Sequence, residues 1–342
     1  MQTFTPLFAC RKLLPVLVLM TFLLGSCGSQ GYRHIGSIEV VDSALYTIVD
    51  PNNPIEVLAE GMIWSEGPLW LEGQNKLIWS DVPANTIYQW AEGKGKEVWL
   101  TPSGYTGTVA RGGETGSNGL VLDPQGRLVL CQHGNRQMAR MNAELDNPKP
   151  SFVSITAAYR SQKFNSPNDA IYNDKGELFF TDPPYGLEKN MKDPLKETPW
   201  QGVYKVNAKG ETILLTDSIT RPNGIALMPD GKTLLIANSD SAKPYWYALE
   251  LGEGDSLLSG RIFYDASAAV RADKGVPDGM KIDRNGNVFA SGPGGLWIFN
   301  KDAKVLGRLR IAGPVSNCAF SKDQKTLYIT ANHEVLRMRL KG

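Results

Sequence analysis

Cysteine and histidine are scarce in this chain, which has four cysteines and three histidines among 342 residues. Cys131 and Cys318 lie within apolar runs, where a thiol is usually a small buried group rather than a nucleophile or half of a disulfide. His34, His133 and His333 are far apart in the sequence. No Cys/His spacing therefore indicates a zinc site.

An excess of charge is also lacking. The chain has 36 Lys and Arg against 35 Asp and Glu, a net charge of +1, which gives no electrostatic basis for nucleic-acid binding. It contains no phosphate-binding loop, no dinucleotide fingerprint and no Gly-x-Ser-x-Gly elbow, which argues against nucleotide-dependent enzymes and serine hydrolases. Turn formers are abundant instead: 35 glycines and 21 prolines are typical of all-β folds.

Apolar runs of membrane length are absent too. The N-terminal run, residues 13–24, is too short to span a bilayer, but it follows Arg11 and Lys12 and has the pattern of a secretory signal. Leu-Gly-Ser-Cys at residues 24–27 resembles a bacterial lipobox, which predicts cleavage before Cys27 and lipidation of that residue. A plain signal peptide with an incidental cysteine is the alternative. We expect a lipid-anchored protein of a bacterial cell envelope, on the periplasmic face or the outer membrane.

Six copies of one sequence pattern define the expected fold. Each copy has a polar residue, a short β-rich run, a polar or glycine turn and a second β-rich run, and third and fourth runs follow in most copies. The copies begin at Glu66, Asn118, Asn168, Asn223, Asp278 and Asn317. Six four-stranded units predict an all-β, six-bladed β-propeller. A two-sheet sandwich is the alternative, but it does not explain six copies in one register.

The sixth copy ends before its fourth strand, and residues 55–59 can supply that strand. Pairing this N-terminal strand with the last blade would close the ring and remove an exposed sheet edge. The expected organisation is therefore a lipoprotein signal peptide with its lipidated cysteine over residues 1–27, a tether and N-terminal extension over 28–54, and the propeller domain over 55–342.

The residues that begin the six copies should form a ring around the propeller axis, because the first strand of each blade lines the central channel. All six carry a side-chain oxygen, and Glu66 and Asp278 are carboxylates. Converging carboxylate and amide oxygens suit a hard divalent cation such as Ca²⁺, Mg²⁺ or Mn²⁺. The alternative is that Asn-Gly and Asp-Gly simply close turns. Hairpin turns further along the copies, and Glu66 in the same register, favour a cation site.

Three further features could contribute to a site on the same face. His133 follows the second strand of the second blade, where it could contact a substrate or be a loop histidine bonded to backbone. The long loops 102–116 and 184–200 could act as lids or be surface insertions.

Four segments, Ser65–Trp70, Asn165–Asp169, Arg221–Ala226 and Pro277–Met280, resemble signatures of the SMP-30/gluconolactonase/LRE family, and Asp182–Gly186 resembles its bacterial gluconolactonase branch. The resemblance covers roughly residues 55–340 and implies a propeller with one divalent metal on the axis, Ca²⁺ first, with Mg²⁺, Mn²⁺ or Zn²⁺ as alternatives. The implied metal ligands are Glu66, Asn168, Asn223 and Asp278. The candidate substrate contacts are Asn118, Asn168, His133 and Tyr185. Ser166 stands where animal members carry a substrate-binding Arg, so that contact is not carried over.

The resemblance implies a metal-dependent hydrolase that opens sugar lactones, with the metal polarising the lactone carbonyl and Asp278 as the acid/base. Two alternatives stay open, because a fold does not decide a chemistry. One is a propeller esterase or phosphotriesterase of other specificity, and the other is a non-catalytic sugar-binding lipoprotein. The expected partners are a small-molecule lactone and, through Cys27, a membrane; we expect a monomer that binds no nucleic acid.

Overall fold

The structure is a computed structural model that describes residues 1–3, 5, 31–254 and 256–341. The N-terminal apolar run, the lipobox and Cys27 lie outside the described residues. In the part that is described, no helix is both long and apolar enough to cross a membrane.

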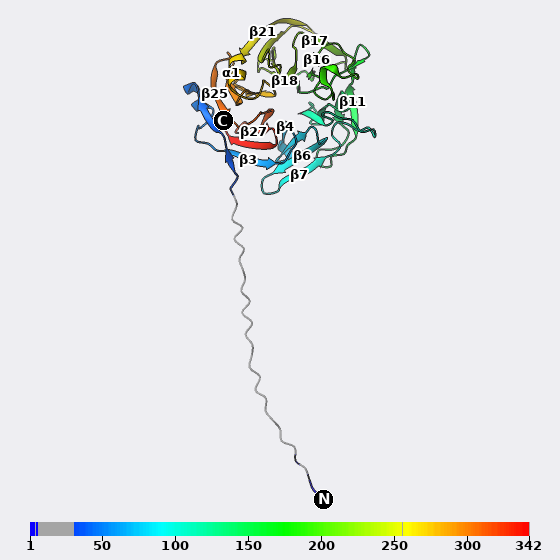
Figure 1. Cartoon of the computed structure of the whole chain (residues 1–342), viewed down its shortest axis with the longest axis vertical. Helices are drawn as coiled ribbons and strands as arrows, with labels where there is room; N and C mark the ends of the chain where they lie inside the picture. The colour runs from blue at the N-terminus through cyan, green and yellow to red at the C-terminus, as the bar shows by residue number, and fades with distance from the viewer. Residues whose placement is uncertain (4, 6–30, 255, 342) are drawn as a thin grey trace. The chain divides into compact units, whose positions relative to one another are not determined.

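Six antiparallel sheets follow one another along the chain and surround a central axis (Figure 1), which confirms the prediction of a six-bladed β-propeller. Blade one consists of β4 (Ser65–Leu71), β5 (Lys76–Asp81), β6 (Thr86–Ala91) and β7 (Gly95–Leu100). Blade two consists of β8 (Ser117–Leu122), β9 (Leu128–Gln132), β10 (Gln137–Met141) and β11 (Phe152–Thr156). Blade three consists of β14 (Ala170–Tyr172), β15 (Leu178–Asp182), β16 (Gly202–Val206) and β17 (Thr212–Thr216).

The remaining blades follow the same order of strands. Blade four consists of β18 (Pro222–Leu227), β19 (Thr233–Asn238), β20 (Tyr245–Leu251) and β21 (Leu257–Asp265). Blade five consists of β22 (Met280–Ile282), β23 (Val288–Gly292), β24 (Gly295–Phe299), β25 (Val305–Arg310) and β2 (Ser37–Val40). Blade six consists of β26 (Asn317–Phe320), β27 (Thr326–Ala331), β28 (Glu334–Arg339), β3 (Ile55–Glu60) and β1 (His34–Ile35). Short elements between them are η1 (Ser43–Thr47), η2 (Glu72–Gln74), β12 (Ala158–Tyr159), β13 (Gln162–Lys163), η3 (Asn190–Lys192) and α1 (Ser267–Ala272).

The second strand of each blade is covered by the neighbouring blades on both faces. Strands β9, β15 and β23 are buried at every residue, which is why they are continuous apolar runs in the sequence rather than alternating patterns. Between blades four and five, Trp246 packs against Trp297 and Phe299 with ring centroids 5.9 and 5.3 Å apart. Aromatic contacts of this kind add to the free energy of burial and hold neighbouring blades together.

The N-terminal strand closes the ring as predicted. Strand β3 pairs antiparallel with β28, with Val57 opposite Leu336 and Ala59 opposite Val335. Val57 and Leu336 are buried in one apolar cluster with residues of blade five. The last blade is therefore completed by the segment that precedes the first blade.

The residues expected to form a tether and extension contain additional strands. Strand β1 pairs with β3, and β2 pairs with β25 of blade five, so each of the last two blades gains a fifth strand. Leu45 of η1 is fully buried, and Ile35 and Ile38 pack against the same apolar cluster. The sequence did not indicate these strands because they are short and carry few apolar residues.

Candidate active site

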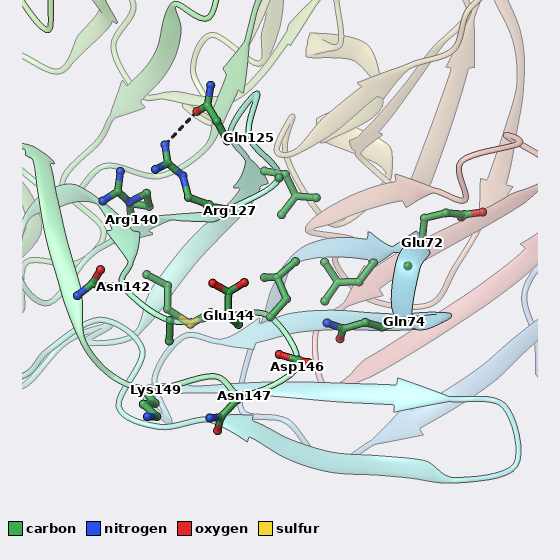
Figure 2. Close-up of a pocket in the computed structure, with 17 residues that line it drawn as sticks. Glu72, Gln74, Gln125, Arg127, Arg140, Asn142, Glu144, Asp146, Asn147 and Lys149 are labelled. Atoms are coloured by element: carbon green, nitrogen blue, oxygen red, sulfur yellow. Dashed lines mark hydrogen bonds between the residues drawn. The ribbon is translucent and has the colours of Figure 1, made fainter.

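A hollow of about 890 Å³ lies between blades one and two, away from the axis (Figure 2). Its rim carries Gln74, Arg127, Arg140 and Glu144. It is lined by the turns that follow the ends of β4 and β8, whereas the predicted ring residues stand at the starts of these strands. The hollow therefore lies at the opposite end of the propeller from the ring, and none of the predicted site residues lines it.

A second cavity of about 210 Å³ opens on the axis at the starts of the first strands. Five of the six predicted ring residues line it: Glu66, Asn118, Asn168, Asn223 and Asp278. Residues separated by more than two hundred positions in the chain thus converge on one small space. Tyr185, predicted as a substrate contact, also lines this cavity.

The loops that lead into the first strands are held by side chains at the ends of the second strands. Both oxygens of Asp182 accept hydrogen bonds from backbone N–H groups, one from Asn165 and one from Ser166, each at 2.8 Å. Asp81 and Asn238 hold the loops before β4 and β18 in the same way. Burial raises the pKa of Asp182 to about 7 even though the two N–H groups lower it. This repeated arrangement positions the ring residues that follow.

Glycines directly after ring residues allow the first strands to approach one another at the axis. A Cβ atom at Gly67 would lie 2.1 Å from the carbonyl oxygen of Asn118, and one at Gly224 would lie 2.2 Å from that of Asp278. These are closer than any side chain tolerates, so glycine is needed for the close contact. The Asn-Gly and Asp-Gly pairs of the ring are therefore packing positions and not hairpin turns.

The two ring carboxylates lie in surroundings that disfavour ionisation. Glu66 is 2% exposed. Burial raises its pKa to about 8, and the charge of Asp169 adds to the rise. Burial also raises the pKa of Asp278 well above its ordinary value, with further contributions from Glu66 and Asp169. Two carboxylates that repel each other in a buried space are stabilised in their ionised form by a cation between them.

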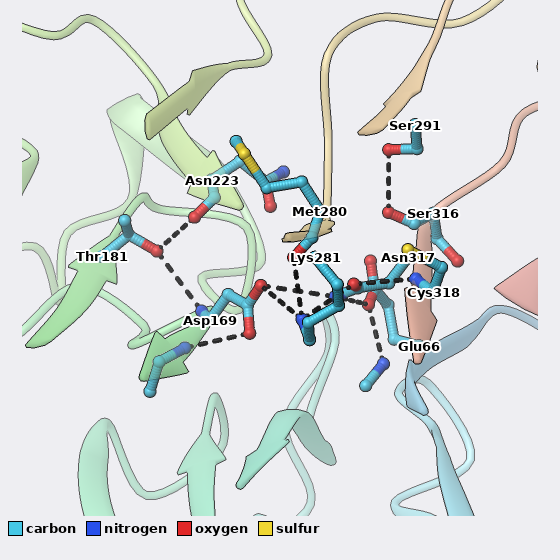
Figure 3. A network of polar contacts seen from close by, with 12 residues as sticks. Glu66, Asp169, Thr181, Asn223, Met280, Lys281, Ser291, Ser316, Asn317 and Cys318 are labelled. Carbon is cyan, nitrogen blue, oxygen red and sulfur yellow. Dashed lines mark hydrogen bonds and ion pairs between the residues drawn. The ribbon is translucent and has the colours of Figure 1, made fainter. Parts of the chain in front are cut away.

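Asn317, the sixth ring residue, lies behind Glu66 and does not line the cavity (Figure 3). Its Nδ2 donates to Glu66 Oε2 at 3.3 Å and to Asp169 Oδ2 at 3.4 Å. Its Oδ1 accepts from the backbone N–H of Cys318 and from Lys281 Nζ, at 2.9 and 3.2 Å. Because its oxygen is occupied, Asn317 differs from the expectation of an oxygen ligand and instead orients Glu66.

The remaining donor set fits a hard divalent cation. Oδ1 of Asn118 and Oδ1 of Asp278 are buried and make no hydrogen bond to any described group. Unsatisfied buried oxygens are costly unless something binds them. Among the described residues, no group of three or more His, Cys, Asp or Glu side chains is placed to hold a metal. A cation here would therefore depend on amide oxygens together with Glu66 and Asp278, as hard cations accept.

The cavity wall contains residues that the sequence did not single out. Trp64, Glu114, Ser239 and Val315 line it, beside the predicted Tyr185 from the loop 184–200. Ser239 Oγ lies 2.5 Å from Tyr185 Oη and 3.3 Å from Asn223 Nδ2. One feature of the sequence could have identified Ser239 as part of this wall. Ser239 directly follows the second strand β19, and such positions share a face with the starts of the first strands.

His133, expected to contact a substrate, does not line the cavity. Its side chain is fully buried, and Nδ1 lies 3.2 Å from Glu114 Oε2. It is thus behind the wall, in contact with a residue that does line the cavity. Any effect of His133 on a ligand would pass through Glu114.

Known proteins that are similar to this chain agree with one another in family and fold. Residues 64–333 match the family model for the SMP-30/Gluconolactonase/LRE-like region. A gluconolactonase from Zymomonas mobilis is 37% identical over 318 residues, which cover 90% of this chain and 87% of that protein. The solved structure of a gluconolactonase from Xanthomonas campestris superposes with a TM-score of 0.76 at 27% identity, covering 91% of this chain and 98% of that one. A calcium-binding protein, regucalcin, from Agrobacterium tumefaciens has the same fold, with a TM-score of 0.63 at 18% identity over 84% of this chain and 94% of its own.

The match to the family model extends over most of the chain and includes blades one to four in full, four of the five strands of blade five, and β26 and β27 of blade six. It also includes every residue that lines the axial cavity. The signature segments, the propeller and the convergence of their polar residues at the axis agree with the match. This protein therefore belongs to the SMP-30/gluconolactonase/LRE-like family.

Proposed function

We propose that this protein is a metal-dependent lactonase that opens sugar lactones of the gluconolactone type. The observation that carries the proposal is the axial cavity, where Glu66, Asp278 and three asparagines converge in a chain 37% identical to a gluconolactonase. Its volume of about 210 Å³ suits a small ligand rather than a polymer.

Glu66, Asn168, Asn223 and Asp278 would hold the cation, because they line one cavity and all offer oxygen. When bound there, a divalent cation supplies electrophilic polarisation of a carbonyl and offsets the charge that develops on its oxygen. Ca²⁺ is the first candidate for an oxygen-only donor set, and Mg²⁺, Mn²⁺ and Zn²⁺ are the alternatives.

Asp278 would handle the proton in this reaction. Its Oδ1 is buried at the cavity and has no hydrogen-bond partner among the described groups, so it can accept a proton from a water molecule. The water oxygen forms a bond to the carbonyl carbon, the ring C–O bond breaks, and the proton passes to the leaving ring oxygen. One lactone and one water thus give one hydroxy acid. Asn118, Asn168 and Tyr185 would orient the sugar hydroxyls from the wall.

Two other functions remain candidates on the same scaffold, namely ester or phosphotriester hydrolysis and sugar binding without catalysis. The buried, unpartnered oxygens favour a site that binds a cation and reacts over one that only binds a sugar. We further propose that the protein is lipid-anchored at Cys27 in the bacterial envelope, as the N-terminal sequence pattern suggests.

The test uses the soluble chain that lacks residues 1–27. Hydrolysis of glucono-δ-lactone, simple esters and a phosphotriester is measured with and without chelator. We expect chelator-sensitive activity on the lactone above the other substrates. Glu66→Gln should need more Ca²⁺ for half-maximal rate and be rescued in part by excess Ca²⁺. Asp278→Asn should stay largely inactive, because it also loses the proton-handling group, a role that contributes about a hundredfold or more.

Two outcomes would count against the proposal. If both variants keep wild-type rates and chelator has no effect, the ring residues contribute only to packing. Faster turnover of the phosphotriester or of a simple ester would favour the second candidate function instead.

A further inference from the structure

Glu114 brings a third carboxylate to the axial cavity, from the loop that leads into β8. It lines the cavity, its side chain is 31% exposed, and its charge contributes to raising the pKa of Asp278. Apart from its ion-pair contact with His133, it makes no hydrogen bond to any described side chain or backbone group. Its carboxylate oxygens are thus free to accept hydrogen bonds from a ligand.

The loop that carries Glu114 is fastened to its neighbours. Arg111 donates to the carbonyl oxygens of Gly134 and Gly186 at 2.6 and 2.7 Å. A Cβ atom at Gly113 would lie 3.1 Å from the backbone Cα of Glu188, so the loop packs closely against the backbone of loop 184–200. Hydrogen bonds and packing therefore hold the loop that carries Glu114 in place at the cavity wall.

The side chain of His133 lies directly behind the Glu114 carboxylate. It is fully buried, and neither ring nitrogen has a hydrogen-bond partner elsewhere in the described part of the chain. Nδ1 lies 3.2 Å from Glu114 Oε2. The backbone N–H of His133 donates to the carbonyl oxygen of Gly116 at 3.1 Å, which ties the residue to the end of the same loop. A buried imidazole cannot hydrogen-bond to bulk water, so the adjacent Glu114 carboxylate is the group with which it can pair.

We propose that Glu114 is a specificity-determining residue that accepts hydrogen bonds from hydroxyl groups on the lactone ring, and that His133 is the positioning residue that holds it. The inference rests on the proposed lactonase function and defines its substrate class: polyhydroxylated lactones in preference to lactones without hydroxyls. A site that hydrogen-bonds a substrate hydroxyl discriminates strongly against an analogue that lacks it, because the buried polar group is then left unpaired.

The experiment compares glucono-δ-lactone with δ-valerolactone, which has the same ring but no hydroxyls. Glu114→Gln should raise KM for glucono-δ-lactone by about tenfold, the lower end for loss of a hydrogen bond to a charged group. Its kcat on that lactone and its kinetics on δ-valerolactone should stay within about twofold, the scale of an ordinary surface substitution. The kinetics are measured in saturating Ca²⁺, because loss of the Glu114 charge near Asp278 should itself weaken Ca²⁺ binding. Glu188→Gln makes the same charge change on the adjacent loop outside the cavity and should behave as wild type.

His133 is tested by a pair of variants. His133→Leu removes the polar contact and should show the same selective rise in KM as Glu114→Gln. His133→Asn places an amide nitrogen near the position of Nδ1 and should restore wild-type KM. The double variant with Glu114→Gln and His133→Leu should have a KM for glucono-δ-lactone little higher than that of either single variant, because both changes act through one contact.

Equal losses on the two lactones in saturating Ca²⁺, or His133→Asn behaving like His133→Leu, would overturn the inference. Binding of glucitol, a polyol with no carbonyl, supplies a readout that does not need catalysis. If the wild type opens neither lactone but binds glucitol, and Glu114→Gln weakens that binding about tenfold, the lactonase proposal fails while Glu114 keeps its role. If the wild type neither opens a lactone nor binds glucitol, both proposals fail.

Discussion

Removing the cation should make the stability of this protein fall as pH rises, because Glu66 is ionised only at a cost in the folded state. Its pKa is raised from 4.5 to about 8, first by burial. Between these values the folded protein holds a proton that the unfolded chain has released. The stabilisation is fully present below about pH 4.5 and is lost as pH rises through about 8.

The size of this effect follows from the pKa difference. A rise from 4.5 to about 8 is about 3.5 pH units, and at about 1.4 kcal/mol per unit this is on the order of 5 kcal/mol as an upper bound. A domain of about 300 residues loses about 1.5 °C of melting temperature per kcal/mol. Between pH 5 and pH 8 on the order of 3 to 4 kcal/mol of this stabilisation is lost, so the metal-free protein should melt roughly 5 °C lower at pH 8 than at pH 5. Asp182, whose pKa is raised to about 7, contributes in the same direction but lies outside the cavity lining.

The assay is thermal unfolding from pH 5 to 9 in chelator and in saturating Ca²⁺. Ca²⁺ should remove the part of the pH dependence that comes from Glu66 and from Asp278, whose pKa burial also raises, and leave the part from Asp182. In chelator, Glu66→Gln should melt above the wild type at pH 8 and close to it at pH 5, because its amide cannot ionise. The exposed control Glu188→Gln should follow the wild type. The reasoning is refuted if the metal-free wild type shows no loss of stability at high pH, or if Glu66→Gln is no more stable than the wild type at pH 8.

Three further predictions concern the network, the ring closure and the anchor. Lys281→Met should tighten Ca²⁺ binding severalfold in calorimetry, because it removes a positive charge 3.7 Å from Asp169 Oδ2 behind Glu66; weaker binding would contradict this electrostatic account. Deleting residues 1–31 should leave the melting temperature near that of the full soluble domain, whereas deletion through residue 60 should lower it sharply, since β28 loses its partner β3; equal stabilities would contradict the closure. Cys27→Ala should abolish lipidation, measured by mass spectrometry of the mature N-terminus, and an unmodified, soluble wild-type N-terminus would remove the basis for the anchor.

The sequence alone was sufficient for the architecture, because a propeller is built from a local pattern that repeats. Each copy has its own strands and turns, so the count of six, the register of the ring and the need for the strand at residues 55–59 could all be read along the chain. The same register placed five ring residues at one cavity. The strands β1 and β2 escaped prediction because they are short and are stabilised by pairing with distant strands.

Only the tertiary structure decided what each polar residue faces. Asn317 and Asn118 are equivalent in the sequence pattern, yet the amide oxygen of Asn317 is occupied by Lys281 and Cys318 while that of Asn118 is unpartnered in the cavity. Glu114 lies in a loop with no repeat signal, and its contact with His133 depends on how that loop folds against the end of β9. Periodicity determines which strand a residue occupies, but side-chain contacts across the axis depend on the packing of six blades, which no local pattern encodes.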